Sequence, residues 1–205
     1  MSSDNADIID LLAGIAPGSR LAAIRGNRAQ ARENAQRSFE ALLEPADPGT
    51  FPLSERYAVA AFVARLHGFD AATDFYADLL GDEAPGLVAL VDEAALSGRT
   101  QGPYGAYREP GLATESTPGL VWTADAAALG ERLAAALTHA HLLVFRPRES
   151  RPEALQALVD AGWSADDIVS LSQLVAFLSF QLRTAWGLRA LASAAPTSST
   201  EGSRA

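Results

Sequence analysis

The chain has 205 residues, is 48% hydrophobic and carries a formal net charge of −9. Such an acidic chain repels phosphate backbones, so we expect no nucleic-acid partner. It contains no cysteine, which excludes thiol nucleophiles, disulfides and cysteine metal sites. All sixteen of its cationic side chains are arginine, which excludes lysine Schiff bases and the phosphate-loop lysine.

Alanine is abundant and alternating apolar runs are short, which favours helices. No apolar run approaches about 18 residues without a charge or break, so we expect neither a membrane span nor a signal peptide, and a cytoplasmic location. The expected organisation is one helical domain over 1–192, with N-terminal helices in 1–50, a core helical hairpin in 53–97, a Gly/Pro/Tyr loop in 98–120, C-terminal helices in 124–192 and a disordered tail in 193–205.

The N-terminal segment predicts a short amphipathic helix over Asp4–Ile15 and a longer one over Leu21–Leu43. The longer helix carries Arg25, Arg28 and Arg32 on one flank. This basic stripe is either a partner surface or a solvated face interleaved with glutamates, and the second interpretation is favoured.

The central segment predicts a helix over Leu53–Leu66, with Ser54 as its capping residue. Gly68 ends this helix, and a second follows over Phe69–Leu80. A third, short helix is expected over Gly86–Leu96.

The segment Gly98–Leu120 has no helical or strand periodicity, and it holds Gly102-Pro103-Tyr104-Gly105 and Tyr107. Loops of this length inside a compact domain are usually functional lids or arms. The alternative is a structural loop pinned by its own tyrosines, and the sequence leaves both open.

The C-terminal segment predicts a helix over Asp125–Phe145 and a second one starting at the capping box Ser150-x-x-Glu153. The pattern Ser164-x-x-Asp167 then caps a long helix over Ala165–Ala192. This helix is apolar nearly all round, so we expect it to be buried in the core or in a subunit interface.

Two groups of residues resemble the AhpD-like superfamily, which contains alkylhydroperoxidase D and carboxymuconolactone decarboxylase, and within it the larger peroxidase-related "CMD domain" proteins. The groups are Arg56-Tyr57-Ala58-Val59-Ala60 with Leu66-His67-Gly68, and Ala161-Gly162-Trp163 through Asp167-Ile168 with Leu174-Val175-Ala176-Phe177 and Arg183 to Leu188. The resemblance implies an all-α fold and a homo-oligomer, from dimer to hexamer, with the catalytic turn near a subunit boundary.

Peroxidases of this family use Glu-x11-Cys-x2-Cys-x3-His. When Leu66-His67-Gly68 is placed on the family turn, the four positions hold Tyr57, Phe69, Ala72 and Tyr76, so no thiol peroxidase chemistry is expected. We expect these four side chains to line a pocket without a cofactor. Further candidates for its lining are Tyr104, Tyr107, Gln173 and Gln181.

A second register places Glu55, His67, Asp70 and Asp74 at the four positions, where they could form an acid/base or metal site. The alternative for the two aspartates is a polar helix terminus, where carboxylates are favoured. We favour this alternative and expect no bound metal.

The sequence holds further charged or titratable residues that could belong to a site. His139 and His141 point to different sides of one helix, so a shared metal is not expected, although one of them could line a pocket. Arg146, Arg148 and Arg151 either hold a carboxylate or lie on the surface. Arg183 lies within an apolar helix, and a buried arginine needs a carboxylate partner; candidates for that partner are Glu55, Asp70 and Glu115.

These features support three functional hypotheses. The first is an AhpD-like oligomer without thiol chemistry that binds a small-molecule ligand or a partner beside an oxidoreductase pathway. The second is a cofactor-independent decarboxylase, isomerase or hydrolase acting on a small carboxylic acid, with His67, Arg183 and Glu55 as catalytic candidates. The third is a structural helical oligomer without a ligand.

Overall fold

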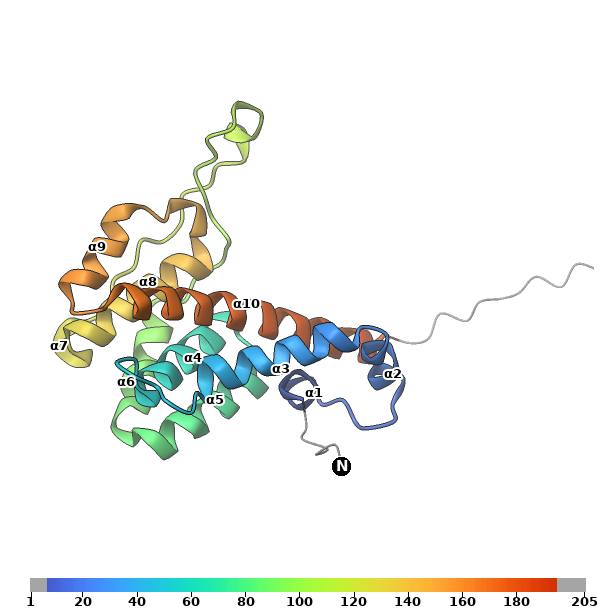
Figure 1. The fold of residues 1–205 in the computed structure, drawn as a ribbon. Coiled ribbons are helices and arrows are strands. Elements are labelled where there is room, and N and C mark those ends of the chain that lie inside the picture. The colour runs from blue at the N-terminus through green and yellow to red at the C-terminus, as the bar shows by residue number, and fades with distance from the viewer. Residues whose placement is uncertain (1–6, 195–205) are drawn as a thin grey trace, which may run out of the picture.

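The computed structural model describes residues 7–194, which form ten α-helices and two short 3-10 helices without a strand (Figure 1). The predicted all-α class is confirmed. The chain order places an N-terminal group of helices, a central hairpin, a projecting loop and a C-terminal group that closes the core.

Helix α4 (Leu53–His67) lies at the centre, packed against α5 (Asp70–Glu83), α6 (Pro85–Ser97), α8 (Glu131–Phe145) and α10 (Ala165–Ser193). Its small alanines favour the helix and let the neighbouring helices approach closely. Gly68 ends α4 in a left-handed conformation with φ of 65°, which favours glycine. The predicted cap at Ser54 was wrong, because Pro52 occupies the capping position and no side chain caps this end.

The N-terminal group consists of α1 (Ile8–Ala13), α2 (Arg20–Gly26) and α3 (Ala29–Leu43). The single helix predicted over residues 21–43 is therefore interrupted between α2 and α3. The turn there brings two members of the basic stripe to α1: Arg25 Nη1 lies 2.8 Å from Asp7 Oδ1, and Arg32 Nη2 lies 2.9 Å from Asp10 Oδ2. Part of the stripe thus holds α1 in place, instead of forming a solvated face.

The C-terminal group consists of α7 (Ala126–Leu129), α8 (Glu131–Phe145), η2 (Pro147–Glu149), α9 (Pro152–Asp160) and α10 (Ala165–Ser193). The helix predicted over 125–145 is divided by Gly130, whose φ is 78°. The capping box at Ser150 was wrong, since no side chain caps α9. The cap at Ser164 is confirmed, because its Oγ accepts from the Asp167 backbone amide at 3.1 Å.

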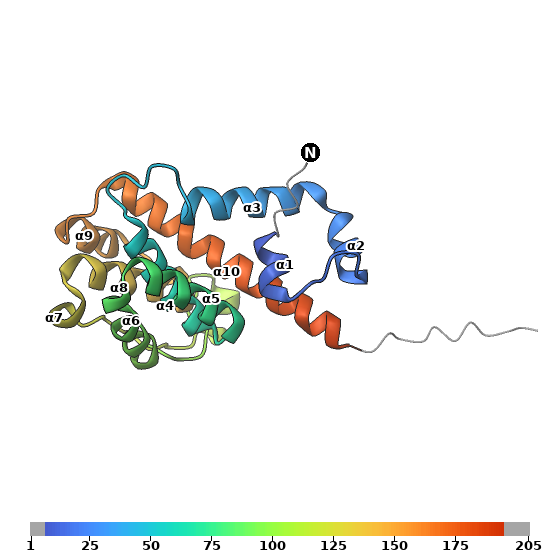
Figure 2. The same cartoon turned by 90° about the horizontal axis from the view of Figure 1, so that it is seen from below.

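Helix α10 runs the length of the molecule beside α3 and across α4 (Figure 2). One face, with Leu171, Leu174, Leu178 and Leu182, is buried, whereas Phe180 and Trp186 are exposed. By length and composition α10 could cross a membrane, but half of its apolar window is buried in the fold, and a core helix passes the same test. The predicted disordered tail lies outside the described residues, apart from Ser193, which ends α10, and Ala194.

The segment 98–120 forms an arm that projects from the body and carries η1 (Pro110–Glu115) near its end (Figure 1). Its base is fixed by an isolated bridge between Gly105 and Thr117 and by the Tyr104 amide, which donates to the Phe145 carbonyl at 2.6 Å. A Cβ on Gly119 would lie 2.2 Å from the Tyr104 ring, so only glycine fits there. The segment is therefore an arm, as one interpretation expected. Its base is held by Tyr104, as the other interpretation expected.

Candidate functional site

The residues expected at the motif positions belong to the packed core. Phe69, Ala72, Tyr76 and Tyr57 are all buried. The Tyr76 hydroxyl donates to Gln181 Oε1 at 2.5 Å, so two predicted lining residues meet, but as a bonded pair within the core.

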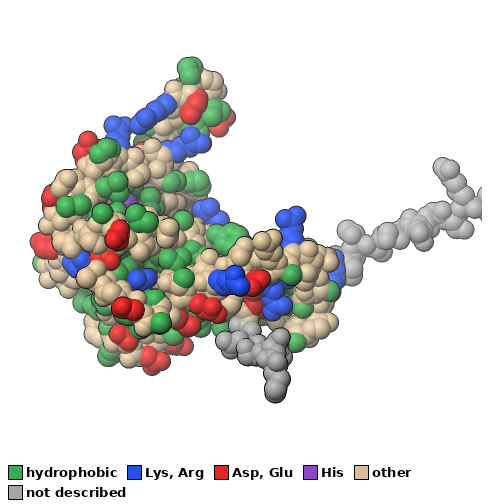
Figure 3. All heavy atoms as spheres, viewed as in Figure 1, with side chains coloured by type: hydrophobic (Ala, Val, Ile, Leu, Met, Phe, Trp, Pro, Cys, Tyr) green, Lys and Arg blue, Asp and Glu red, His purple; other side chains and the backbone are tan. Residues whose placement is uncertain are grey.

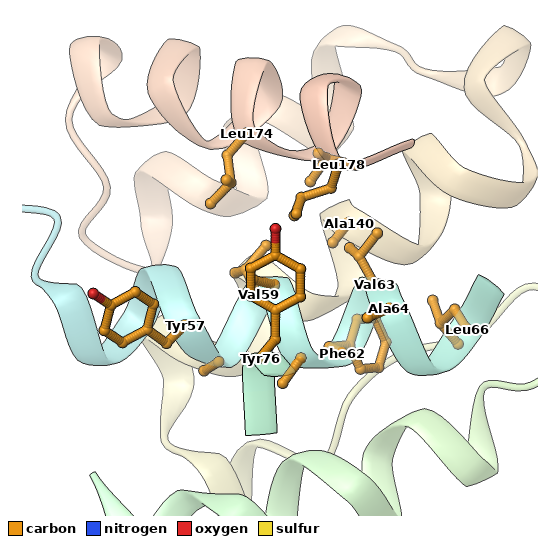
Figure 4. Close-up of a cluster of buried hydrophobic side chains, with 14 of the residues drawn as sticks. Tyr57, Val59, Phe62, Val63, Ala64, Leu66, Tyr76, Ala140, Leu174 and Leu178 are labelled. Atoms are coloured by element: carbon orange, nitrogen blue, oxygen red, sulfur yellow. The ribbon is translucent and has the colours of Figure 1, made fainter. Parts of the chain in front are cut away.

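The close-up of this region shows how the space around Tyr76 is filled. Its hydroxyl points from α5 towards Leu174 and Leu178 of α10, while Tyr57 lies further along α4 (Figure 4). Tyr76, Leu174 and Leu178 are all fully buried. The turn after α4 therefore presents packed side chains where the sequence analysis expected a pocket.

The remaining predicted lining residues do not join this group. Gln173 is exposed on α10, away from the buried Gln181. Tyr104 and Tyr107 lie in the arm, where the Arg148 guanidinium sits 4.3 Å from the centre of the Tyr107 ring. The prediction that these residues share one pocket was wrong, because they lie on different faces and elements.

The four residues of the second register do not come together to form a site either. Glu55 lies in the first turn of α4 and pairs with Arg132, whose Nε is 2.9 Å from Oε1, while His67 ends the same helix. Asp70 and Asp74 are exposed on α5. Among residues 7–194, no group of three histidine or carboxylate side chains could hold a metal ion.

His67 and Arg183 lie near each other, but neither is placed as expected. Burial and, to a smaller extent, the positive charge of Arg183 lower the pKa of His67 to about 4. The Nε2 atom of His67 is buried without a hydrogen-bond partner among the described residues. Arg183 is exposed, so the prediction of a buried arginine with a carboxylate partner was wrong: the face of α10 that carries it is turned away from the core.

The best-formed cavity lies elsewhere, between α8, α9 and the segment 121–126, with a volume of about 700 Å³. This volume is in the range of small-molecule sites. The walls are mostly small or apolar side chains, including Val121, Trp122, Ala134, Leu142, Ala154 and Ala157. We call this cavity the α8–α9 cleft.

Two hydrogen bonds place α8 and α9 as antiparallel neighbours. Arg132, near the start of α8, donates from Nη1 to the Gly162 carbonyl just after α9, at 2.7 Å. The Trp163 indole donates back to the Arg132 carbonyl at 3.0 Å. The start of α8 therefore lies beside the end of α9, and the cleft runs between the two helices.

His139 and His141 both line the cleft and are almost completely buried. The space-filling view shows a histidine among hydrophobic side chains in this region (Figure 3). His141 Nε2 lies 2.8 Å from the Gly98 carbonyl, which can only accept, so Nε2 carries the proton and Nδ1 is the acceptor. His139 Nε2 lies 3.1 Å from Ser172 Oγ, and its Nδ1 is buried without a partner in the described region.

Burial lowers the pKa of both cleft histidines, so both are neutral at physiological pH. The Thr138 hydroxyl accepts from the Ala124 amide at 3.0 Å and donates to the Ala134 carbonyl at 2.8 Å, so its bonds are made internally. The two histidines and Thr138 therefore add no charge to the cleft, whose charged lining residues are Glu131, Arg146, Glu149, Arg151, Glu153 and Asp160.

Of the three arginines that follow α8, two line the cleft and one does not. Arg146 Nε donates to Glu149 Oε2 at 2.9 Å, so its charge is paired within the chain. Arg151 lines the cleft and has no ion pair in the region described. Arg148 instead packs on the arm.

Four cleft residues were candidates from the sequence, namely His139, His141, Arg146 and Arg151, whereas most of the others, above all Trp122, were not predicted. The sequence holds only a weak signal for these cleft residues. It consists of the alanines of α8 and α9, two helices joined by a tight connection. Comparisons of the chain with models of protein families, with curated proteins and with solved structures found no match.

Proposed function

We propose that this protein binds a small, largely apolar molecule in the α8–α9 cleft and performs no thiol chemistry. The observation that carries the proposal is a cavity of about 700 Å³ with apolar walls and two buried histidines whose pKa values are lowered. Such a combination of apolar walls and few polar groups is typical of ligand sites.

We also propose that the chain is a thiol-free relative of the AhpD-like superfamily that assembles with itself, without membrane or nucleic-acid partners and in the cytoplasm. Support comes from the α4–α5 hairpin, closed by a long C-terminal helix, and from the replacement of all four motif side chains. A role beside an oxidoreductase pathway belongs to the same proposal, since a relative that has lost its own redox groups would keep a binding function.

The second candidate function is acid/base catalysis without a cofactor, by a decarboxylase, isomerase or hydrolase. His141 favours it, because hydrogen bonding fixes its tautomer and a neutral Nδ1 can accept a proton. The earlier candidates do not support it, since His67 and Glu55 lie at opposite ends of α4 and Arg183 is exposed on α10. We therefore place any such chemistry at His141.

The binding proposal is tested by titrating the protein with the neutral probe N-phenyl-1-naphthylamine and following probe fluorescence. We expect saturable binding at one site. Ala157→Phe fills the cleft from an exposed position on α9 and should weaken binding by about tenfold or more, equivalent to about 1.4 kcal/mol.

The matched control is Ala41→Phe, which adds the same ring to an exposed alanine of α3 outside the cleft and should leave the affinity unchanged. Absence of saturable binding, or equal affinity of the Ala157→Phe variant and the parent protein, would contradict the proposal. Turnover of a hydroperoxide by the purified protein would contradict its thiol-free part.

A further inference from the structure

The imidazole of His141 is held in a fixed orientation at the wall of the α8–α9 cleft. His141 lines the cleft, yet the residue is only 1% exposed. Its Nε2 donates to the Gly98 carbonyl at 2.8 Å, and a Cβ added to Gly98 would lie 3.2 Å from the adjacent Cδ2. The Cδ2–Nε2 edge of the ring therefore faces Gly98, and Nδ1 lies on the opposite side of the ring.

The Nδ1 atom of His141 differs from that of His139. His139 Nδ1 is enclosed, since it is one of three side-chain polar atoms in the described residues that have neither accessible surface nor a hydrogen-bond partner. His141 Nδ1 also makes no hydrogen bond among residues 7–194, but it is not one of these three enclosed atoms. It therefore keeps accessible surface, and because His141 lines the cleft, that surface opens into the cleft.

The tautomer of His141 makes Nδ1 a hydrogen-bond acceptor. Because the Gly98 carbonyl requires the proton on Nε2, Nδ1 has a lone pair and no hydrogen. An acceptor that loses water and gains no other donor costs free energy. A ligand that fills the cleft must therefore donate a hydrogen bond to Nδ1, or it leaves this acceptor unpaired.

The polar side chains beside His141 already have partners. The Trp122 ring centre lies 5.1 Å from that of the imidazole, and its indole N–H donates to Ser97 Oγ at 3.0 Å. The Trp122 side chain therefore offers carbon surface to the cleft. Arg146 Nε donates to Glu149 Oε2 at 2.9 Å. The wall at His141 thus combines aromatic carbon with one open acceptor.

The donor group that fits this wall is neutral. Burying an ammonium group costs free energy unless a carboxylate pairs with it, and Glu149 is already in an ion pair with Arg146. An ionised carboxylate has no hydrogen to donate to Nδ1. A hydroxyl group supplies the hydrogen without a charge, and an aromatic ring suits a wall that contains Trp122.

We propose that the α8–α9 cleft selects neutral aromatic compounds with a free hydroxyl group, such as phenols, and that the hydroxyl donates to His141 Nδ1 while the ring packs on the apolar walls. This inference rests on the proposed ligand-binding function and assigns its ligand class. A compound with the same body but no hydroxyl hydrogen leaves Nδ1 unpaired and binds less tightly than its apolar surface alone predicts.

The test uses two probes that share one body: 4-butylphenol and 4-butylanisole, in which a methyl group replaces the hydroxyl hydrogen. Each competes with N-phenyl-1-naphthylamine for the full-length protein at neutral pH. The quantity compared is the ratio of the two dissociation constants in the parent protein and in His141→Phe, because this comparison cancels the different hydrophobicity of the probes. We expect the ratio to shift about fivefold against the phenol in the variant, the effect of one hydrogen bond.

The matched control is His67→Phe, which makes the same replacement at the end of α4, outside the cleft, and should keep the ratio of the parent protein. Thermal unfolding of each variant checks that the fold is retained.

A second measurement needs no folded variant. The chain has three histidines, so the nitrogen NMR spectrum of its imidazoles contains few resonances. The resonance of an unprotonated ring nitrogen moves when the nitrogen accepts a hydrogen bond. We expect 4-butylphenol to move the resonance of His141 Nδ1, and 4-butylanisole to leave it in place.

The outcomes separate the two proposals. An unchanged ratio in His141→Phe, an equal change in His67→Phe, or a His141 Nδ1 resonance that 4-butylphenol leaves in place overturns the hydroxyl assignment. Saturable binding of the dye then leaves the ligand-binding function standing. Failure of the dye and of both probes to bind overturns both proposals.

Discussion

The hydrogen bond between Tyr76 and Gln181 joins α5 to α10 inside the core. Both side chains are fully buried, and the Gln181 Nε2 has no partner among the described residues. One polar atom of the Gln181 amide, Nε2, is therefore unpaired. The hydrogen bond from the Tyr76 hydroxyl satisfies the other, Oε1, and so lowers the free-energy cost of burying the amide. Tyr76 thus makes a structural polar contact within the core.

Removing the Tyr76 hydroxyl should destabilise the fold. Tyr76→Phe leaves Gln181 Oε1 unpaired at full burial, so we expect the free energy of unfolding in urea to fall by about 1–3 kcal/mol. The double variant Tyr76→Phe/Gln181→Met replaces both partners with apolar groups and should recover most of the loss. Tyr57→Phe is the control, because the buried Tyr57 makes no side-chain hydrogen bond among the described residues; a loss as large there would contradict the argument.

His67 should make stability depend on pH. Its pKa is about 4 in the folded protein and 6.5 in a model peptide, so between these values the unfolded chain binds a proton that the folded chain does not. The free energy of unfolding therefore falls as the pH decreases through this window, by at most about 3 kcal/mol from this residue. Urea unfolding at about pH 7 and about pH 4.5 measures the change.

His67→Gln removes this proton uptake and should make stability less dependent on pH. Part of the dependence should remain, because burial also lowers the pKa of His139 and His141 and their contributions have the same sign. An identical dependence in the parent protein and the variant would show that His67 titrates normally.

At the scale of helices, composition and apolar periodicity predicted most elements but not their interruptions, and only one of the three predicted side-chain caps forms. Helix α10 and its cap at Ser164 follow from the sequence. The break between α2 and α3 does not, because it is set by ion pairs from Arg25 and Arg32 to α1, which only the folded chain brings together. The break at Gly130 had a visible signal, since glycine accommodates the positive φ there.

The candidate site was less predictable than the helices because it depends on how two helices face each other. The cleft arises where the alanines of α8 and α9 leave space between antiparallel neighbours, and an alanine-rich sequence gives no sign of which face stays open. The exposure of Arg183 could not be predicted for a related reason. Helix α10 is apolar nearly all round, so its periodicity did not reveal which face is exposed.

At the scale of the whole molecule, two exposed hydrophobic side chains of α10 support the proposed self-association. Phe180 is 52% and Trp186 is 68% exposed, although both lie on the longest helix of the fold. Large exposed hydrophobic side chains on one element are typical of protein contacts. We therefore place the proposed contact between copies at these two side chains of α10.

Replacing these two side chains should reduce the assembly state. We expect light scattering coupled to size exclusion to give an oligomer mass for the parent protein and a smaller mass for Phe180→Ser/Trp186→Ser, because the change removes the apolar contact. Leu96→Ser, at an exposed apolar position on α6, should keep the parent mass. A monomeric parent protein, or an unchanged mass in the double variant, would refute this placement.

The arm separates the chain into two halves that depend on each other. It leaves and rejoins the fold at Gly105 and Thr117, which are paired by the bridge at its base. The first half supplies α1 to α6 and the second supplies α7 to α10, yet α4 is enclosed by α8 and α10, and α10 packs on α1 and α3. The fold thus has the organisation of a complementation pair, in which two fragments divided at the arm would each present a face that only the other can cover.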